Sequence, residues 1–283
     1  MRYSMWSQYL RGTSPENCVR DFSKKGWHFL ELSSEHGELL LSRGNEEKTG
    51  RDFSGYAKDY GISFPQGHLW LTADIAAVKQ NETIDILKRW LDLFYAIDIK
   101  ACVLHCGGNE MAALGKTDSE IQEARINALK ILCNHIQSSD MYICMENLSR
   151  FTVNALDLKT LINSVGSERL AICLDTGHLN MCGLSQSEFI EQASGFLKAL
   201  HVTDNEGKFD QHIMPYGRGN INWDNFISAL AKSPYDGLLN FEIPGETPNI
   251  PYELLLAKLD YLRELAIYMT LKINSIRFSE VSE

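Results

Sequence analysis

The chain has 283 residues, with 27 Lys and Arg residues against 37 Asp and Glu residues, so its formal net charge is −10. An apolar content of 44% and a charged content of 23% are ordinary for a globular protein, which excludes disordered and fibrous classes. The acidic balance argues against broad binding of nucleic acids or anionic membranes, because both favour a basic surface.

The cysteines and the N-terminus bear on the cellular compartment. Seven cysteines, an odd number without a CxxC pair, predict buried and reduced thiols. The first residues lack the charged and then apolar layout of a signal peptide. No apolar run approaches the roughly 18 residues that span a bilayer. The sequence therefore predicts a cytoplasmic protein without a membrane segment.

Eight short apolar runs alternate with helical stretches along the chain. Each run is rich in Val, Ile, Leu, Cys or aromatic residues and is bounded by polar residues or Gly, which is typical of strands buried on both faces. The predicted strands are Arg2–Tyr9, Trp27–Ser33, Ile62–Trp70, Lys100–His105, Met141–Asn147, Leu170–Asp175, Leu197–Thr203 and Leu238–Ile243.

Between these runs, apolar residues recur with the 3.6-residue period of a helix. The clearest predicted helices are Ala73–Ile97, Asp118–Ser138 and Pro251–Met269. Thr117, with Glu120 three residues later, predicts a capping box. Eight alternating strands and helices favour one (β/α)8 TIM-barrel domain over residues 1–283. An open doubly wound sheet is the alternative, but the sequence has no GxGxxG or Walker loop to support it.

Polar side chains follow the ends of six consecutive predicted strands. In a TIM barrel, these carboxyl ends meet at one rim, where the chemistry takes place. The candidate metal ligands are His68, His105, Glu146, Asp175, His178, His201, Asp210, His212 and Glu242. Buried carboxylates are costly unless they are paired or bind a metal, and imidazole with carboxylate is the usual ligand set for transition metals. The sequence therefore predicts a metal site, with a hydrogen-bonded polar cluster as the alternative.

The remaining histidines are expected to be structural. His28 lies at a strand start, His36 in a polar loop and His135 on a helix. Two aromatic residues near the predicted rim, Trp6 and Trp70, are expected either to stack on a sugar face or to pack. The sequence leaves both alternatives open.

Several motifs carry a family likeness: MENLSR, CLDTGH, HVTDN with the following DQHIMPYGRGNINW, and FEIPG. With these motifs the chain resembles the xylose-isomerase-like TIM-barrel superfamily, which includes sugar and sugar-phosphate isomerases and epimerases and the endonuclease-IV-like enzymes. The resemblance implies a divalent metal ion (Mn, Zn, Co or Mg) and a small sugar-like substrate. The acidic balance argues against a nucleic-acid partner, no membrane partner is expected, and a homo-oligomer is left open.

In the ketose 3-epimerase branch of that superfamily, one ion is held by four strand-end residues. Their counterparts here are Glu146, Asp175, His201 and Glu242. The following run resembles that branch's E-x-x-N-R-[FY]-E run, with Ser149 and Thr152 in place of its Asn and final Glu. The resemblance thus implies a metal-dependent sugar, sugar-phosphate or keto-sugar isomerase or epimerase that works through a metal-stabilised enediolate.

The same resemblance implies roles for individual side chains. Glu146 and Glu242 would act as the general acid and base, and His178 would hydrogen-bond a substrate hydroxyl or the developing oxyanion. Further substrate contacts are expected from His68, His105, Arg218, Trp6 and Trp70. Arg218, the arginine of the GRG motif, is expected either to contact the substrate or to be an ordinary loop residue.

The endonuclease-IV-like branch uses nine ligands for three zinc ions. All nine candidate positions are filled here, so a trinuclear-zinc phosphodiesterase or AP endonuclease is the alternative function. The other signatures of that branch differ, since Gly177 stands in CLDTGH where it has Cys. A third possibility is a sugar-binding barrel without turnover. The number of ions, one or three, separates the two enzyme classes.

Overall fold

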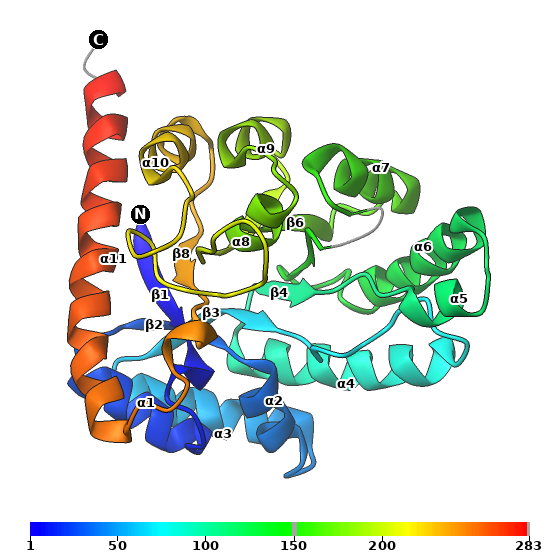
Figure 1. Ribbon diagram of the computed structural model, residues 1–283. Coiled ribbons are helices and arrows are strands. Elements are labelled where there is room, and N and C mark those ends of the chain that lie inside the picture. The colour runs from blue at the N-terminus through cyan, green and yellow to red at the C-terminus, as the bar shows by residue number, and fades with distance from the viewer. Residues whose placement is uncertain (149–151, 282–283) are drawn as a thin grey trace.

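The computed structural model describes residues 1–148 and 152–281, which are arranged around eight parallel strands (Figure 1). The strands are β1 (Arg2–Trp6), β2 (Phe29–Leu32), β3 (Ser63–His68), β4 (Ala101–Leu104), β5 (Tyr142–Glu146), β6 (Leu170–Asp175), β7 (Leu197–His201) and β8 (Leu238–Phe241). Hydrogen bonds join them in the order β7-β6-β5-β4-β3-β2-β1-β8. A parallel bridge between Val202 and Phe241 joins the two ends of this sheet. The predicted (β/α)8 TIM barrel is therefore confirmed.

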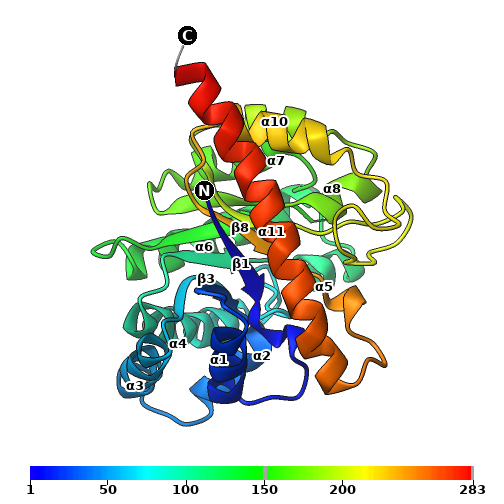
Figure 2. The same ribbon diagram turned by 90° about the vertical axis from the view of Figure 1, so that its left-hand side faces the viewer.

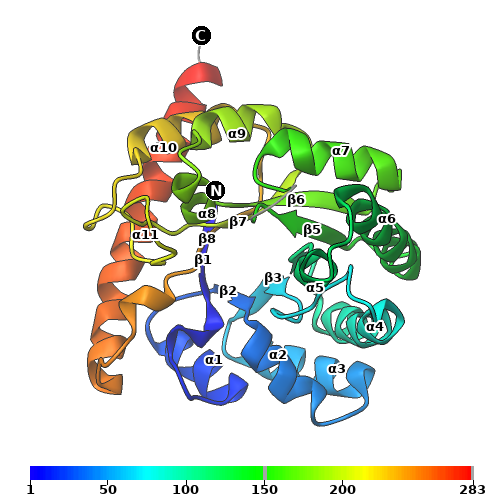
Figure 3. The same ribbon diagram turned by 45° about the vertical axis from the view of Figure 1, so that its right-hand side comes forward.

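Helices surround the strands on the outside of the barrel (Figure 3). They are α1 (Pro15–Lys24), α2 (Ser34–Leu41), α3 (Glu46–Asp59), α4 (Gln80–Ile97), α5 (Asn109–Ala113), α6 (Asp118–His135), α7 (Ala155–Val165), α8 (Thr176–Met181), α9 (Gln186–Gln192), α10 (Trp223–Lys232) and α11 (Tyr252–Val281), with short 3-10 turns η1 (Ser7–Tyr9) and η2 (Pro244–Glu246). Among the described residues, no helix combines the length and the apolar character that crossing a membrane requires.

All three predicted helices have different bounds in the structure: α6 ends at His135 instead of Ser138, and the other two differ more. The chain up to α4 forms turns instead of a helix, because Asp74 Oδ1 accepts hydrogen bonds from the backbone N–H groups of Ala76 and Gly108. These hydrogen bonds hold the segment against the loop after β4, and they compete with the backbone hydrogen bonds of a helix. The last helix continues past Met269, and Ile273 on that continuation is fully buried. Figure 2 shows α11 running along the whole barrel wall.

The predicted start of α6 is confirmed. Thr117 Oγ1 accepts a hydrogen bond from the backbone N–H of Glu120, whose side chain accepts one from the backbone N–H of Thr117. These reciprocal bonds satisfy two N–H groups that the first turn of a helix leaves without partners.

The placement of His36 in a polar loop is wrong, because this residue lies in α2 and is buried. Ser33 caps that helix by accepting a hydrogen bond from the backbone N–H of His36. The imidazole Nδ1 lies 2.9 Å from Ser7 Oγ, and Nε2 lies 3.1 Å from the Thr13 carbonyl oxygen. Both ring nitrogens therefore have partners within the protein.

Burial of the strands on both faces explains why the sequences of the predicted strands are almost continuously apolar. All residues of β4, β6 and β8 are buried, since one face of each strand fills the barrel and the other packs under the helices. Six of the cysteines are buried, as predicted, but the prediction is wrong for Cys182, which follows α8 and is exposed. All seven are free thiols.

Candidate metal centre

The candidate ligands come together at one rim of the barrel because parallel strands all end on the same side. Four of them are the last residues of strands: His68, Glu146, Asp175 and His201. Two more, His105 and Glu242, lie directly after β4 and β8. The side chains form three overlapping groups, and the potential ligand atoms within each group lie within 4.8 Å of one another.

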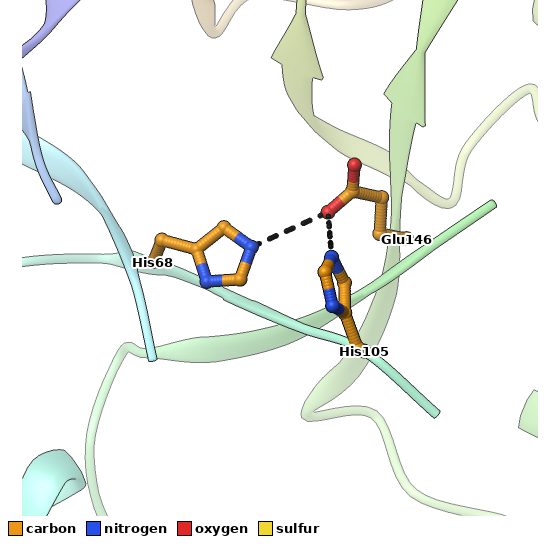
Figure 4. A group of neighbouring side chains, drawn as sticks. All are labelled: His68, His105 and Glu146. Carbon is orange, nitrogen blue, oxygen red and sulfur yellow. Dashed lines mark hydrogen bonds and ion pairs between the residues drawn. The ribbon is translucent and has the colours of Figure 1, made fainter. Parts of the chain in front are cut away.

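The first group, called here the His68 group, contains His68, His105 and Glu146. Figure 4 shows both imidazoles directed at the same carboxylate oxygen. Glu146 Oε2 lies 3.1 Å from His105 Nε2 and 3.5 Å from His68 Nε2. The carboxylate is almost completely buried, so an ion here would be bound by two imidazoles and one carboxylate.

The central group contains Glu146, Asp175, His201 and Glu242. His201 Nδ1 lies 3.1 Å from Glu146 Oε1 and 3.0 Å from Glu242 Oε2. Asp175 Oδ1 accepts a hydrogen bond from the backbone N–H of His178. Its other oxygen, Oδ2, is buried and has no hydrogen-bond partner among the described residues. Because an unpartnered buried carboxylate oxygen is costly, this atom fits a metal ligand.

The third group, called here the His212 group, contains Asp175, His178 and His212. Asp210 lies between the two imidazoles, with Oδ2 3.4 Å from His178 Nε2 and Oδ1 3.0 Å from His212 Nε2. Glu146 and Asp175 each belong to two groups. Their shared positions allow neighbouring ions to be bridged, so the donor set can hold from one to three ions.

The loop that carries Asp210 and His212 is held by a buried carboxylate that belongs to none of the three groups. Asp204 accepts hydrogen bonds from the backbone N–H of Ile221 and, at 2.8 Å, from Trp223 Nε1. A Cβ atom at Gly219 would lie only 2.1 Å from this carboxylate. The HVTDN and GRGNINW motifs therefore fold against each other and place the loop over the rim.

The imidazoles are oriented by their second ring nitrogens. Nδ1 of His68 lies 2.8 Å from the Leu69 carbonyl oxygen. Nδ1 of His178 and of His212 each lie 3.1 Å from a backbone carbonyl oxygen. A carbonyl only accepts, so Nδ1 carries a proton, and Nε2 is the ring nitrogen that would coordinate an ion at the rim. Protein metal sites orient their histidines in this way.

The carboxylates give the rim a strongly negative potential. Burial alone would lower the pKa of His212, but its hydrogen bond to Asp210 and the charge of Glu242 raise it to about 10. Burial likewise opposes the charge on His178, yet Asp175 and Asp210 raise its pKa to about 12. In the absence of a metal ion, protons on these two imidazoles therefore balance the charge of the carboxylates. A divalent cation bound at the rim would balance the same charge.

The remaining expected site residues are not part of these groups. Trp6 is buried at the end of β1, and Trp70 is half-buried against the core. Arg218 is exposed on the loop after β7. Within the run after the first ligand, Ser149 lies outside the described residues, and Thr152 is buried. His28 and His135 lie away from the rim, as expected, and His135 Nε2 pairs with Asp92 at 2.8 Å.

Sequence reasoning missed one charged residue that contacts the central group. Glu31 lies inside β2 and is fully buried, with Oε1 2.9 Å from His201 Nε2. The signal was available in the sequence, since a glutamate stands between Leu30 and Leu32 in the middle of a predicted buried strand. A charge inside a strand buried on both faces needs a specific partner.

Comparison with known protein families adds to this geometry. A family model described as "Xylose isomerase-like TIM barrel" matches residues 19–265. The solved structure of a D-psicose 3-epimerase, determined in the presence of D-fructose, superimposes with a TM-score of 0.79. It is 15% identical in sequence, and the superposition covers 95% of this chain and 99% of that one. This likeness concerns the fold.

Curated relatives match shorter stretches of sequence. The uncharacterized protein y4fM of Sinorhizobium fredii is 24% identical over 67% of this chain and 59% of its own length. A probable endonuclease 4 of Mycoplasma pneumoniae is 28% identical over 62% of this chain and 65% of its own length. The chain spans about six-tenths of the length of the curated relatives it matches.

Proposed function

The chain belongs to the xylose isomerase-like TIM-barrel family, and on this premise we propose that it is a divalent-metal-dependent isomerase or epimerase of a small sugar, sugar acid or sugar phosphate. One observation carries the proposal: two carboxylates, Glu146 and Glu242, flank a single imidazole nitrogen beside the unpartnered Oδ2 of Asp175. The fold shared with a D-psicose 3-epimerase supports the same reading.

The central group would hold the ion through Glu146, Asp175, His201 and Glu242. Once bound, a divalent ion supplies Lewis-acid stabilisation to adjacent carbonyl and hydroxyl oxygens, and so to an enediolate. Mixed nitrogen and oxygen donors suit Mn, Zn or Co, and the high share of oxygen also admits Mg.

Proton transfer would be carried out by Glu146 and Glu242. One carboxylate would take the proton from the carbon next to the carbonyl, and the other would return a proton to that carbon or its neighbour. Glu242 retains 12% side-chain exposure, whereas Glu146 is enclosed, so Glu242 is the more accessible carboxylate. His178 would hydrogen-bond a substrate hydroxyl or the developing oxyanion, and Arg218 would orient a substrate group from the loop above.

The experiment is a proton-exchange assay in deuterated water with a panel of ketoses, aldoses and sugar phosphates, in the presence of Mn²⁺. We expect the wild type to introduce deuterium next to the carbonyl of its substrate. Glu146→Gln and Glu242→Gln should each lower the exchange rate by about 10²- to 10⁴-fold, the usual share of general acid–base catalysis. Asp140→Asn at the other end of the barrel is the matched control. Full exchange by both glutamate variants would contradict the assigned roles.

A second function, a trinuclear-zinc phosphodiesterase or AP endonuclease, is favoured by the presence of three overlapping groups instead of one. The relationship to a probable endonuclease 4 supports it as well. With neutral histidines the nine candidate ligands carry a charge of about −4, so three divalent ions would leave about +2 and one ion about −2. A positive site suits a phosphodiester, and a weakly negative one suits a neutral sugar.

Elemental analysis of the purified protein separates these two functions. One ion per chain together with solvent exchange into a sugar supports the isomerase. Three zinc ions per chain together with cleavage of an abasic duplex would favour the phosphodiesterase.

A further inference from the structure

A polar layer crosses the barrel interior next to the central group. Glu31 of β2 accepts hydrogen bonds from Gln66 Nε2 of β3 at 3.2 Å and from Asn240 Nδ2 of β8. Ser4 of β1 donates to Asn240 Oδ1 at 2.7 Å. All four side chains are buried. Branched apolar side chains normally fill the interior of a TIM barrel, so this layer departs from the usual packing.

The partners of the Glu31 carboxylate place it against a metal-ligand candidate. Two of its three donors are neutral amides, and the third is the imidazole of His201, 2.9 Å away through Nε2. The opposite ring nitrogen, Nδ1, faces the carboxylates of the central group. The imidazole therefore stands between the carboxylate of Glu31 on one side and the proposed ion position on the other.

We propose that Glu31 is a positioning residue that keeps the proton of His201 on Nε2, so that the Nδ1 lone pair faces the ion of the central group. This inference rests on the proposed metal-dependent function. Glu31 acts through His201 and touches neither the ion nor the substrate. The other tautomer would direct a lone pair at the Glu31 carboxylate and a proton at the ion, and both contacts are repulsive.

The other rim histidines show why a carboxylate here has a distinct effect. His68, His178 and His212 are each oriented by a backbone carbonyl, which no substitution removes. His201 is oriented by a side chain that also carries a negative charge. A carboxylate behind a ligand imidazole makes the imidazole a stronger donor to the metal, and loss of such a partner typically lowers metal affinity 10- to 100-fold.

The first test is a titration of the full chain with Co²⁺. Calorimetry measures the affinity, and the visible spectrum reports on the ligands of the bound ion. Glu31→Gln keeps the side-chain volume and removes the charge. We expect its Co²⁺ affinity to fall about 10- to 100-fold and the spectrum of the bound ion to shift. Ser4→Ala is the matched control, because it alters the same polar layer without touching Glu31 or His201. Its Co²⁺ affinity should stay within about threefold of wild type.

The spectrum distinguishes positioning from general support of the fold. If the role of Glu31 were purely structural, the Glu31→Gln substitution would lower the unfolding free energy of the metal-free protein. It would leave the spectrum of the bound ion unchanged. A Glu31→Gln protein with wild-type Co²⁺ affinity and spectrum would therefore overturn the inference.

The second test needs no variant. In the Zn²⁺-loaded wild type with ¹⁵N-labelled histidine, we expect the proton of His201 on Nε2 and the metal on Nδ1. A proton on Nδ1 would overturn the inference even if Glu31→Gln failed to fold. A wild type that bound neither Co²⁺ nor Zn²⁺ would instead overturn the proposed function, so the two failures are distinguishable.

Discussion

The two ends of the barrel differ in how their charged side chains are satisfied. At the rim where the strands end, Glu146 and Asp175 are buried among histidines, and one oxygen of Asp175 has no partner among the described residues. At the opposite end, Lys100 Nζ lies 2.7 Å from Asp98 and 2.8 Å from Asp140, and all three side chains are exposed to solvent. Carboxylates are common to both ends, but their partners at the rim are histidines, whereas at the second end the partner is an exposed lysine.

This difference supports the rim as the site of the proposed reaction. The second end also contains a cavity of about 540 Å³, lined in part by Arg2, Lys198 and Asp236. Its size does not make it the active site, because its lining contains none of the residues of the three groups. At the rim, by contrast, the carboxylates face histidines, and the buried Oδ2 of Asp175 has no hydrogen-bond partner among the described residues, so a cation would satisfy an oxygen that the protein does not. The environment of a charged group is thus more informative than the size of the cavity beside it.

The largest difference between the two ends is expected from a carboxylate-to-amide change at each of them. Asp175→Asn should lower Co²⁺ affinity by at least about 100-fold, because loss of a ligand should exceed the 10- to 100-fold effect of an outer partner. Asp140→Asn should leave the affinity unchanged. Isothermal titration calorimetry measures both. Equal affinities in the two variants would show that the rim does not bind the ion.

A second prediction concerns the stabilisation of the folded protein by a bound metal ion. If the rim needs a cation, Mn²⁺ or Zn²⁺ at about 100 times its dissociation constant should raise the unfolding free energy by about 2.7 kcal/mol. A chelator should remove the gain. Urea denaturation with and without the ion measures it, and Asp175→Asn should show almost none of it. An ion that left the midpoint unchanged in the wild type would contradict the prediction.

His36 is a buried histidine outside the three groups, and it has no carboxylate partner within the described part of the chain. Burial lowers the pKa of His36 from 6.5 to about 4, so this imidazole stays neutral in the folded protein. The unfolded chain binds more protons between these values. The stability contribution is therefore complete above pH 6.5 and is lost as the pH falls toward 4.

At pH 5 this loss should amount to about 2 kcal/mol. Urea denaturation at pH 7.5 and pH 5 should therefore show a smaller change in the His36→Gln variant than in the wild type. The comparison between the two proteins removes the contribution of the rim histidines. Identical pH dependences would mean that His36 is protonated without cost.

The smallest effect is expected at the end whose charges are paired. Lys100→Ala should change the unfolding free energy by less than about 1 kcal/mol, since exposed ion pairs contribute little. Metal affinity and solvent exchange should match the wild type. A loss of metal binding in this variant would remove the distinction between the two ends.

Much of the barrel was predictable because buried parallel strands leave a continuous local signal. The predicted strand Leu170–Asp175 coincides with β6, and the capping box before α6 was read from two residues. The start of α4 was not predictable in the same way. The helical period of the sequence continues through that segment. In the structure, however, Asp74 accepts hydrogen bonds from backbone N–H groups of a loop more than thirty residues away.

The candidate site was predictable as a set of residues but not as an arrangement. By itself, the sequence determined that nine histidines and carboxylates follow strand ends, because the ends of parallel strands all face one rim. Only the tertiary structure decided that they form three groups, with Glu146 and Asp175 shared between groups. It also decided that Glu31 of β2 meets His201 of β7 across the interior. These contacts depend on barrel closure and strand stagger, which bring together residues up to 170 positions apart and leave no local pattern to read.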